Sequence, residues 1–144
     1  MAAEAFRTFT AAEANALLPQ VRPIVERLRA EAERARETEE LLSDLDAYYG
    51  DSADAPDNPE REKRDSLREA LAAAEGGVGD ALVELHDLGI EVKDIDRGLI
   101  DFHGERDGQI IYLCWESGEP SVAFWHPLEG GFAARQPIEG GRQP

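Results

Sequence analysis

Cysteine is scarce in this chain of 144 residues, where Cys114 is the single one. A lone cysteine excludes an internal disulfide and a cysteine-rich zinc cluster, and it is typical of proteins in a reducing cytoplasm. Long apolar runs are missing too, because no stretch approaches the roughly 18 consecutive apolar residues that a membrane-spanning helix needs. The first residues also lack the basic segment and apolar stretch of a secretory signal, so we expect a cytoplasmic protein.

Positive charge is in short supply as well. The formal net charge is -16, and lysine occurs at Lys63 and Lys93 alone. An acidic surface repels phosphate, so the sequence predicts neither a nucleic-acid-binding protein nor one held on an anionic membrane. The partner classes that remain are a second copy of the chain and a basic protein.

The first part of the sequence has the pattern of two helices. Thr10 and Glu13 form a capping box, and apolar residues then recur at alternating spacings of four and three, which is typical of a helix–helix seam. A second helical pattern begins near Pro59 and ends at Leu88. We therefore predict an antiparallel helical hairpin over residues 10–88, with an acidic loop near residues 50–58.

Two features of this hairpin leave alternatives open. Pro19 and Pro23 lie inside the first helix, so that helix is either kinked or divided into a short and a long segment. The glycine-rich stretch Gly76–Gly79 predicts either a local bend or break in the second helix, or a place where the backbone makes a close contact.

From Gly89 onward the apolar pattern changes to a period of two, which is typical of strands. The strand-like runs are GIEVKDI, GLIDFH, QIIYLCWE and SVAFWHP. Short loops between them predict a four-stranded antiparallel meander over residues 89–127, followed by a C-terminal loop or tail over 128–144. The chain is therefore expected to be a single α+β domain, residues 1–144, with the hairpin packed on the sheet.

The loop lengths predict which side chains share a face of this sheet. A five-residue loop over Gly104–Gly108 and a four-residue loop over Ser117–Pro120 would assign the strand residues to two faces. The face expected to pack on the helices comprises Ile100, Phe102, Ile110, Tyr112, Cys114, Ala123 and Trp125. The opposite face comprises Leu99, Asp101, His103, Gln109, Ile111, Leu113, Trp115, Val122, Phe124 and His126.

The second face would carry too much apolar surface to remain in water. Its cover could be the C-terminal segment, the first helix or a second copy of the chain. We favour the second copy, so the sequence predicts a homodimer.

The polar end of the second face collects Asp101, His103 and His126, a set of residue types that can bind zinc or iron. Asp101 and His126 would lie two strand spacings apart, roughly 9–10 Å, so a metal would need help from the loops. Arg135 is predicted to reach Asp101 or Glu119 as a paired guanidinium. We interpret Cys114 as a small buried side chain and not as a nucleophile.

Three longer segments resemble a known family. FTAAEANALLPQVRP, GIEVKDIDRGLIDF and YLCWESGEPSVAFWHPLEGGFAARQP are similar, in that order, to a small bacterial family called domain of unknown function 2203. The resemblance covers nearly the whole chain and implies a stand-alone bacterial protein. It implies no activity, cofactor or catalytic residue. The family pattern often has proline where this chain has His103, which weakens the metal hypothesis based on two histidines.

These observations favour a non-enzymatic, homo-oligomeric assembly or interaction module without a cofactor. The alternative is a small protein or enzyme that binds a divalent metal at a polar site around Asp101, His126 and Arg135. A third hypothesis is a site at which Arg135 and His126 bind a small anion.

Overall fold

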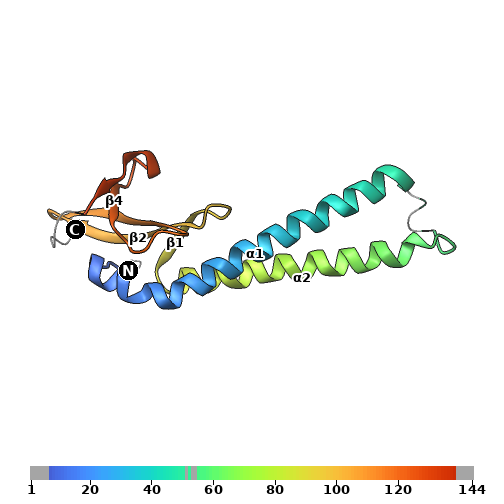
Figure 1. Cartoon of the computed structure of the whole chain (residues 1–144), viewed down its shortest axis with the longest axis horizontal. Coiled ribbons are helices and arrows are strands. Elements are labelled where there is room, and N and C mark those ends of the chain that lie inside the picture. Colours follow the sequence, from blue (N-terminus) through green and yellow to red (C-terminus); the bar gives the residue numbers. More distant parts are fainter. Residues whose placement is uncertain (1–6, 51, 53–54, 139–144) are drawn as a thin grey trace, which may run out of the picture.

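The computed structural model describes residues 7–50, 52 and 55–138, and it has the predicted α+β architecture (Figure 1). A helical hairpin is followed by an antiparallel sheet, as the periodicity predicted. The elements are α1 (Ala11–Tyr49), α2 (Glu60–Asp87), β1 (Ile90–Asp94), β2 (Leu99–Arg106), β3 (Gln109–Glu116), β4 (Phe124–Pro127), the 3-10 turn η2 (Phe132–Ala134) and β5 (Gln136–Pro137). None of the helices in the described part is long and apolar enough to cross a membrane.

The helix ends follow the sequence signals. The Thr10 hydroxyl accepts a hydrogen bond from the Glu13 N–H at 3.0 Å, and the Glu13 carboxylate accepts one from the Thr10 N–H at 2.9 Å. Asn58 Oδ1 accepts a hydrogen bond from the Glu60 N–H at 2.9 Å, at the start of α2. Gly89 ends α2 with a φ of 88°, a conformation that favours glycine.

The prolines and the glycine cluster do not divide the helices. Pro19 and Pro23 lie inside α1, which is one helix from Ala11 to Tyr49, so a separate short helix over Thr10–Leu18 is excluded. The predicted break at Gly76–Gly79 is wrong, because α2 is continuous there. A Cβ atom on Gly77 would lie 2.8 Å from Glu31 Cγ, so the close-contact alternative is confirmed at that glycine.

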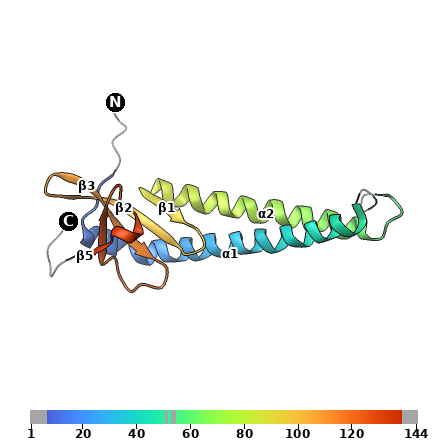
Figure 2. The same ribbon diagram turned by 90° about the horizontal axis from the view of Figure 1, so that it is seen from above.

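The helices are much longer than the sheet is wide, and half of the hairpin extends beyond it (Figures 1 and 2). At about 1.5 Å per residue, the 39 residues of α1 span roughly 58 Å. The core that packs on the sheet includes α1 residues up to Leu28 and α2 residues from Val78 onward. We call residues 31–49 and 60–77 the arm, and the remaining described residues other than 50–59 the body.

The sheet has five antiparallel strands in the order β1-β2-β3-β4-β5, one more than predicted. The additional strand, β5, pairs with β4 through the backbone of residues 136–137. It is too short to show a period of two, which explains why the sequence pattern placed it in a tail.

The register between β2 and β3 differs from the prediction. The turn consists of Asp107 and Gly108, with φ values of 52° and 81°, so Arg106 pairs with Gln109 across a two-residue hairpin. Positive φ at both positions is the requirement of a type I′ turn, for which Asp-Gly is a preferred sequence. Asp101 therefore pairs with Cys114 and not with Ile111.

This register turns every β3 side chain to the face opposite to the predicted one. Leu113 and Trp115 are buried against the helices together with Ile100 and Phe102, whereas Tyr112 and Cys114 share the other face with Asp101 and His126. The predicted apolar outer face is thus wrong, because Leu113, Trp115 and Val122 belong to the core of the chain itself.

The outer face of the sheet is covered within the chain. The helices lie on one side of the sheet and the segment containing η2 lies on the other (Figure 1). The Arg135 guanidinium stacks 4.1 Å from the centre of the Phe124 ring on this outer face. The apolar side chains predicted for the outer face are covered within the chain: the helices cover Leu113, Trp115 and Val122, and the C-terminal segment covers Phe124. They give no reason for a dimer through the sheet face, and dimerisation itself stays a prediction.

Candidate functional site

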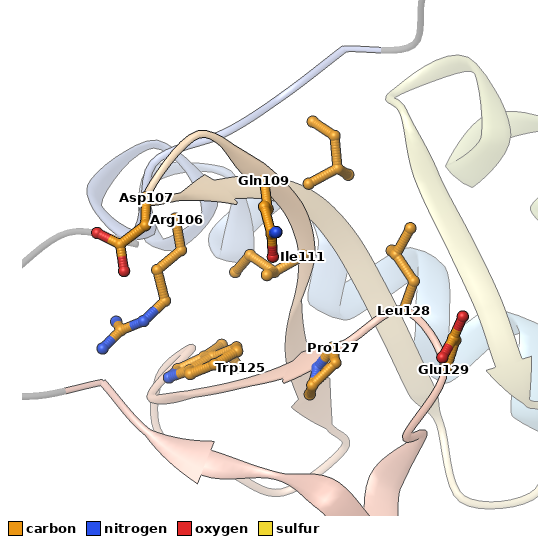
Figure 3. A pocket seen from close by; sticks show the side chains of 9 residues that line it. Arg106, Asp107, Gln109, Ile111, Trp125, Pro127, Leu128 and Glu129 are labelled. Atoms are coloured by element: carbon orange, nitrogen blue, oxygen red, sulfur yellow. The ribbon is translucent and has the colours of Figure 1, made fainter.

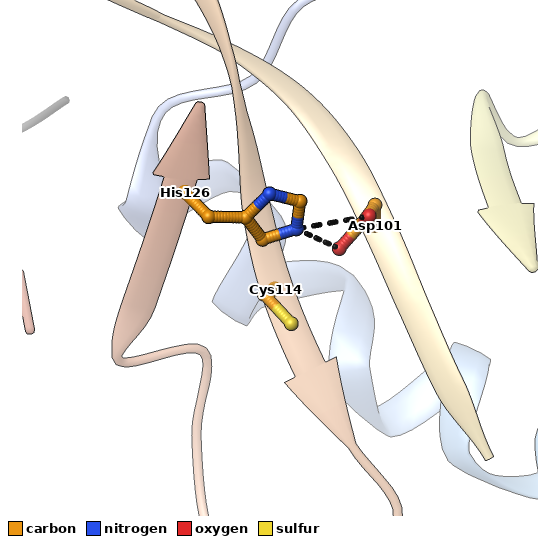
Figure 4. A group of neighbouring side chains, drawn as sticks. All are labelled: Asp101, Cys114 and His126. Atoms are coloured by element: carbon orange, nitrogen blue, oxygen red, sulfur yellow. Dashed lines mark hydrogen bonds and ion pairs between the residues drawn. The ribbon is translucent and has the colours of Figure 1, made fainter. Parts of the chain in front are cut away.

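A buried polar cluster lies on the outer face of the sheet. Asp101, Cys114 and His126 come from the adjacent strands β2, β3 and β4, and one ligand-type atom from each lies within 4.8 Å of the others (Figure 4). Their exposed fractions are 1%, 0% and 2%. The predicted separation of Asp101 and His126 was too large, because both side chains lean across the short Cys114 between them and meet at 3.2 Å.

The partners of the two His126 ring nitrogens show which of them donates a hydrogen bond. Nδ1 lies 2.8 Å from the carbonyl oxygen of Pro127, which can only accept, so Nδ1 carries a hydrogen and donates it. Nε2 lies 3.2 Å from both carboxylate oxygens of Asp101.

The environment of the cluster shifts two pKa values upward. Burial raises the pKa of the Asp101 carboxyl, against the opposing charge and hydrogen bond of His126. Burial and the nearby Asp101 charge raise the pKa of the Cys114 thiol to about 12. Cys114 is thus a neutral thiol at physiological pH in the metal-free protein, and an exposed thiolate nucleophile is excluded.

His103 does not join this cluster, although the sequence hypothesis grouped it with Asp101 and His126. Its Nε2 lies 3.1 Å from the Glu91 carboxylate. The Tyr112 ring lies between the two histidines, with ring centres 5.0 Å from His103 and 5.3 Å from His126. The structure therefore brings Asp101 and His126 together and adds Cys114, while His103 belongs to a neighbouring polar group.

Cys114 was missed as a member of the site because the predicted loop placed it on the helix-facing side. The signal that could have found it is the Asp107-Gly108 pair, a strong marker of a two-residue hairpin. Counting back from that turn brings Cys114 opposite Asp101.

Arg135 pairs with Glu119, one of its two predicted partners. Its terminal nitrogen donates to Glu119 Oε1 at 2.8 Å, and the same carboxylate oxygen also accepts from the Glu116 N–H at 2.8 Å. The guanidinium groups of Arg135 and Arg97 both stack on the Phe132 ring, 4.5 Å and 4.1 Å from its centre. These contacts fasten the C-terminal segment over the sheet.

The first turns of α1 hold the connection between β3 and β4. Asn15 accepts a hydrogen bond from the Val122 N–H at 2.8 Å and donates one to the Val122 carbonyl at 3.1 Å. Arg22 donates to the Pro120 carbonyl, and Arg29 donates to the Ser117 hydroxyl at 3.1 Å. Polar side chains of the helix thereby position the connection that leads into β4, the strand that carries His126.

A separate surface pocket of about 480 Å³ lies at the other end of β3 (Figure 3). Arg106 stacks on the Trp125 ring at 4.6 Å, and Leu128 is half exposed at the rim. The lining mixes apolar surface with charges of both signs from Arg106, Asp107 and Glu129. It shares no residue with the Asp101–Cys114–His126 cluster, and it contains no paired acid and base suited to catalysis.

The far end of the arm carries a shallow groove. Leu41 and Tyr48 are 50% and 81% exposed. They line the groove together with charged residues of both helices, including Asp44 and Lys63.

Comparisons with known proteins agree with the resemblance in the sequence. Comparison with curated proteins finds no match, and comparison with solved structures finds none. The family model described as "Uncharacterized conserved protein (DUF2203)" matches residues 7–138, which is most of the chain. The protein therefore belongs to this uncharacterized conserved family.

Proposed function

We propose that the protein is a non-enzymatic assembly module that forms a homodimer through the far end of its arm. The observation that carries this proposal is the exposure of Leu41 and Tyr48 on a hairpin that extends away from the body (Figure 1). The two residues are separated by two helical turns, so they lie on one stripe of α1. A stripe of large apolar side chains in water favours an interface.

The weak packing inside the arm supports the same proposal. Thr38, Leu45 and Ala74 are its buried residues, and two of these three side chains are small. A pair of helices with so little buried apolar area gains little stability from its own seam. Packing on the arm of a second copy would bury Leu41 and Tyr48 and give a four-helix arrangement.

The charges in the groove favour a second copy over a partner of one charge sign. Asp44 of α1 and both Glu60 and Lys63 of α2 line it. In a two-fold interface the same surface meets itself, so Asp44 of each copy can pair with Lys63 of the other. The overall charge of -16 on each copy opposes the association, and salt should therefore strengthen it by screening.

Light scattering on the eluting protein, over a range of concentrations and at low and high salt, tests the proposal. We expect a dimer whose fraction rises with both variables, and we expect Leu41→Glu combined with Tyr48→Glu to give a monomer. The matched control is Ser43→Glu combined with Ala47→Glu, which adds the same charge at exposed positions on the opposite side of α1.

Two results would contradict the proposal. One is a wild-type chain that remains monomeric at submillimolar concentration in high salt. The other is a control variant that dissociates as fully as the Leu41/Tyr48 variant, because this would show that added charge and not the apolar stripe decides association. Circular dichroism confirms that each variant keeps its helices.

A further inference from the structure

The cluster on the outer face of the sheet has the composition of a metal site. It combines the carboxyl group of Asp101 on β2, the thiol of Cys114 on β3 and the imidazole of His126 on β4 (Figure 4). We propose that Asp101, Cys114 and His126 bind a zinc ion that fastens these three strands together on the face turned away from the helices. The proposal is independent of whether the arm forms a dimer.

The orientation of His126 is the first argument. Histidine ligands of metals usually donate their second ring hydrogen to a backbone carbonyl or a carboxylate, which fixes the ring. His126 Nδ1 does so to the Pro127 carbonyl at 2.8 Å. Nε2 is thereby directed at the Asp101 carboxylate, with Cys114 beside it, as a ligand nitrogen should be.

The spacing of the ligand atoms is the second argument. Zinc bonds of about 2.0–2.3 Å in a tetrahedral site place neighbouring ligand atoms about 3.3–3.6 Å apart. Nε2 of His126 and the carboxylate oxygens of Asp101 are 3.2 Å apart, and the three ligand atoms all lie within 4.8 Å. A tetrahedral site needs a fourth ligand besides these three, and a water molecule would supply it.

The charge balance is the third argument. A carboxylate and a thiolate together neutralise Zn²⁺, so a buried site with these ligands carries no net charge. A buried aspartate–histidine pair alone contributes little to stability, because the cost of removing its charges from water offsets their attraction. The mixed nitrogen, sulfur and oxygen ligand set suits zinc more than magnesium or calcium, which prefer oxygen.

The place of the site in the fold is the fourth argument. The apolar core cluster takes its sheet residues from the helix-facing side, such as Ile100, Leu113 and Trp115. The outer face has no comparable apolar cluster among the described residues, and polar side chains are buried there instead. A structural zinc ion would supply the stabilisation on this face that apolar packing supplies on the other.

The test uses the full, untagged chain, stripped with a chelator and then dialysed against Zn²⁺ or Co²⁺. We expect one ion per chain by elemental analysis and a higher melting temperature for the loaded protein. The cobalt form should show the visible bands of a tetrahedral site and a near-ultraviolet thiolate-to-cobalt band.

The variants separate this site from other sources of metal uptake. Cys114→Ser should lose the thiolate-to-cobalt band, and His126→Gln should lose stoichiometric binding. His103→Gln is the matched control, because His103 is a second buried histidine on the same face but pairs with Glu91, and it should retain both signals. If His126→Gln does not fold, the loss of the band in Cys114→Ser still decides the role of the cluster.

Three outcomes would overturn the proposal. The stripped wild-type chain could take up no stoichiometric zinc or cobalt. Its cobalt form could lack the thiolate band, which would exclude Cys114 as a ligand. Finally, His126→Gln could bind as much metal as His103→Gln, which would assign the uptake to the acidic surface of the chain.

Discussion

The body and the arm are built from the same two helices, yet they are stabilised differently. In the body, α1 and α2 pack on a sheet face lined by large side chains such as Phe102 and Trp115. In the arm, the helices pack mainly on each other, apart from the ion pair of Arg36 with Asp96, and the seam includes Ala74, Thr38 and the close contact of Glu31 with Gly77. The difference indicates that the body specifies the fold, while the arm is available for contacts with other molecules.

A matched pair of leucine substitutions should give the largest contrast between the two regions. Leu28 is fully buried in the core of the body, and Leu45 is buried in the seam of the arm. We expect Leu28→Ala to lower the free energy of unfolding by about 4–5 kcal/mol and Leu45→Ala by about 2 kcal/mol, since a thin seam can collapse around the lost volume. Urea unfolding of the monomer measures both, and equal losses would contradict the comparison.

A pair of asparagine substitutions should give the next contrast. Asn15→Ala removes the hydrogen bond to the Ala11 carbonyl and both hydrogen bonds with Val122, whose buried N–H and carbonyl are left without their side-chain partner. We expect a loss of about 1–3 kcal/mol. Asn58→Ala removes the hydrogen bonds of its side chain with the Glu60 N–H and the Ser52 carbonyl at the start of α2, and we expect a loss of about 0.5–1 kcal/mol. Thermal unfolding of the two variants side by side would show whether the order is reversed.

Alanine substitutions in α2 should distinguish the glycines that have open space around them from Gly77, where Glu31 lies close. An added Cβ meets nothing within 4 Å at Gly76 or Gly79, so Gly76→Ala and Gly79→Ala should each stabilise the protein by about 0.5–1 kcal/mol. Gly77→Ala should give no gain, because Glu31 must move away first. Helix melting followed by circular dichroism measures the three variants, and a gain at Gly77 equal to the other two would show that Glu31 moves freely.

The smallest expected effect is the loss of stability at acidic pH when the Glu91 carboxylate is protonated. Burial alone would raise the pKa of Glu91, but hydrogen bonds from Lys93 and Tyr112 and the positive charge of Lys93 outweigh it and lower that pKa below 4.5. Glu91 therefore stabilises the body above pH 4.5, and this contribution is lost as the pH falls through its lowered pKa. Because Glu91 is partly exposed, the effect should be about 0.2–1 kcal/mol.

Unfolding of wild type and Glu91→Gln at pH 6 and at acidic pH checks this prediction. The wild-type chain should lose more stability than the variant on acidification. The opposite order would show that the burial cost of the carboxylate exceeds the value of its partners.

Much of the fold could be predicted because its signals are local. The capping box at Thr10, the seam of α1 and the span of β3 each follow from a few neighbouring residues, and the structure confirms them. The continuity of α2 through Gly76–Gly79 could not be predicted in this way. Helix propensity counts against glycine there, but packing of Val78 and Ala81 on the core stabilises the helix.

Only part of the candidate site was predicted, because the pairing between strands depends on the lengths of the turns. Asp101 and His126 share a face as predicted, although the predicted pairing was shifted by an odd number of residues both between β2 and β3 and between β3 and β4, so that the two errors cancelled. The membership of Cys114 depended on the length of one turn, and an odd error in that length exchanges the faces of a whole strand. Local patterns therefore gave the residues of each strand correctly but not the relation between strands.

Because Cys114 is buried, its reaction with a thiol reagent can report movement of the segment that covers it. It is the one thiol in the chain and has no exposed surface. Arg135 lies close enough to influence its ionisation, and this arginine belongs to the segment held over the sheet by Phe132 and Glu119. The rate at which a thiol reagent labels Cys114 would therefore measure how often this segment moves away from the sheet.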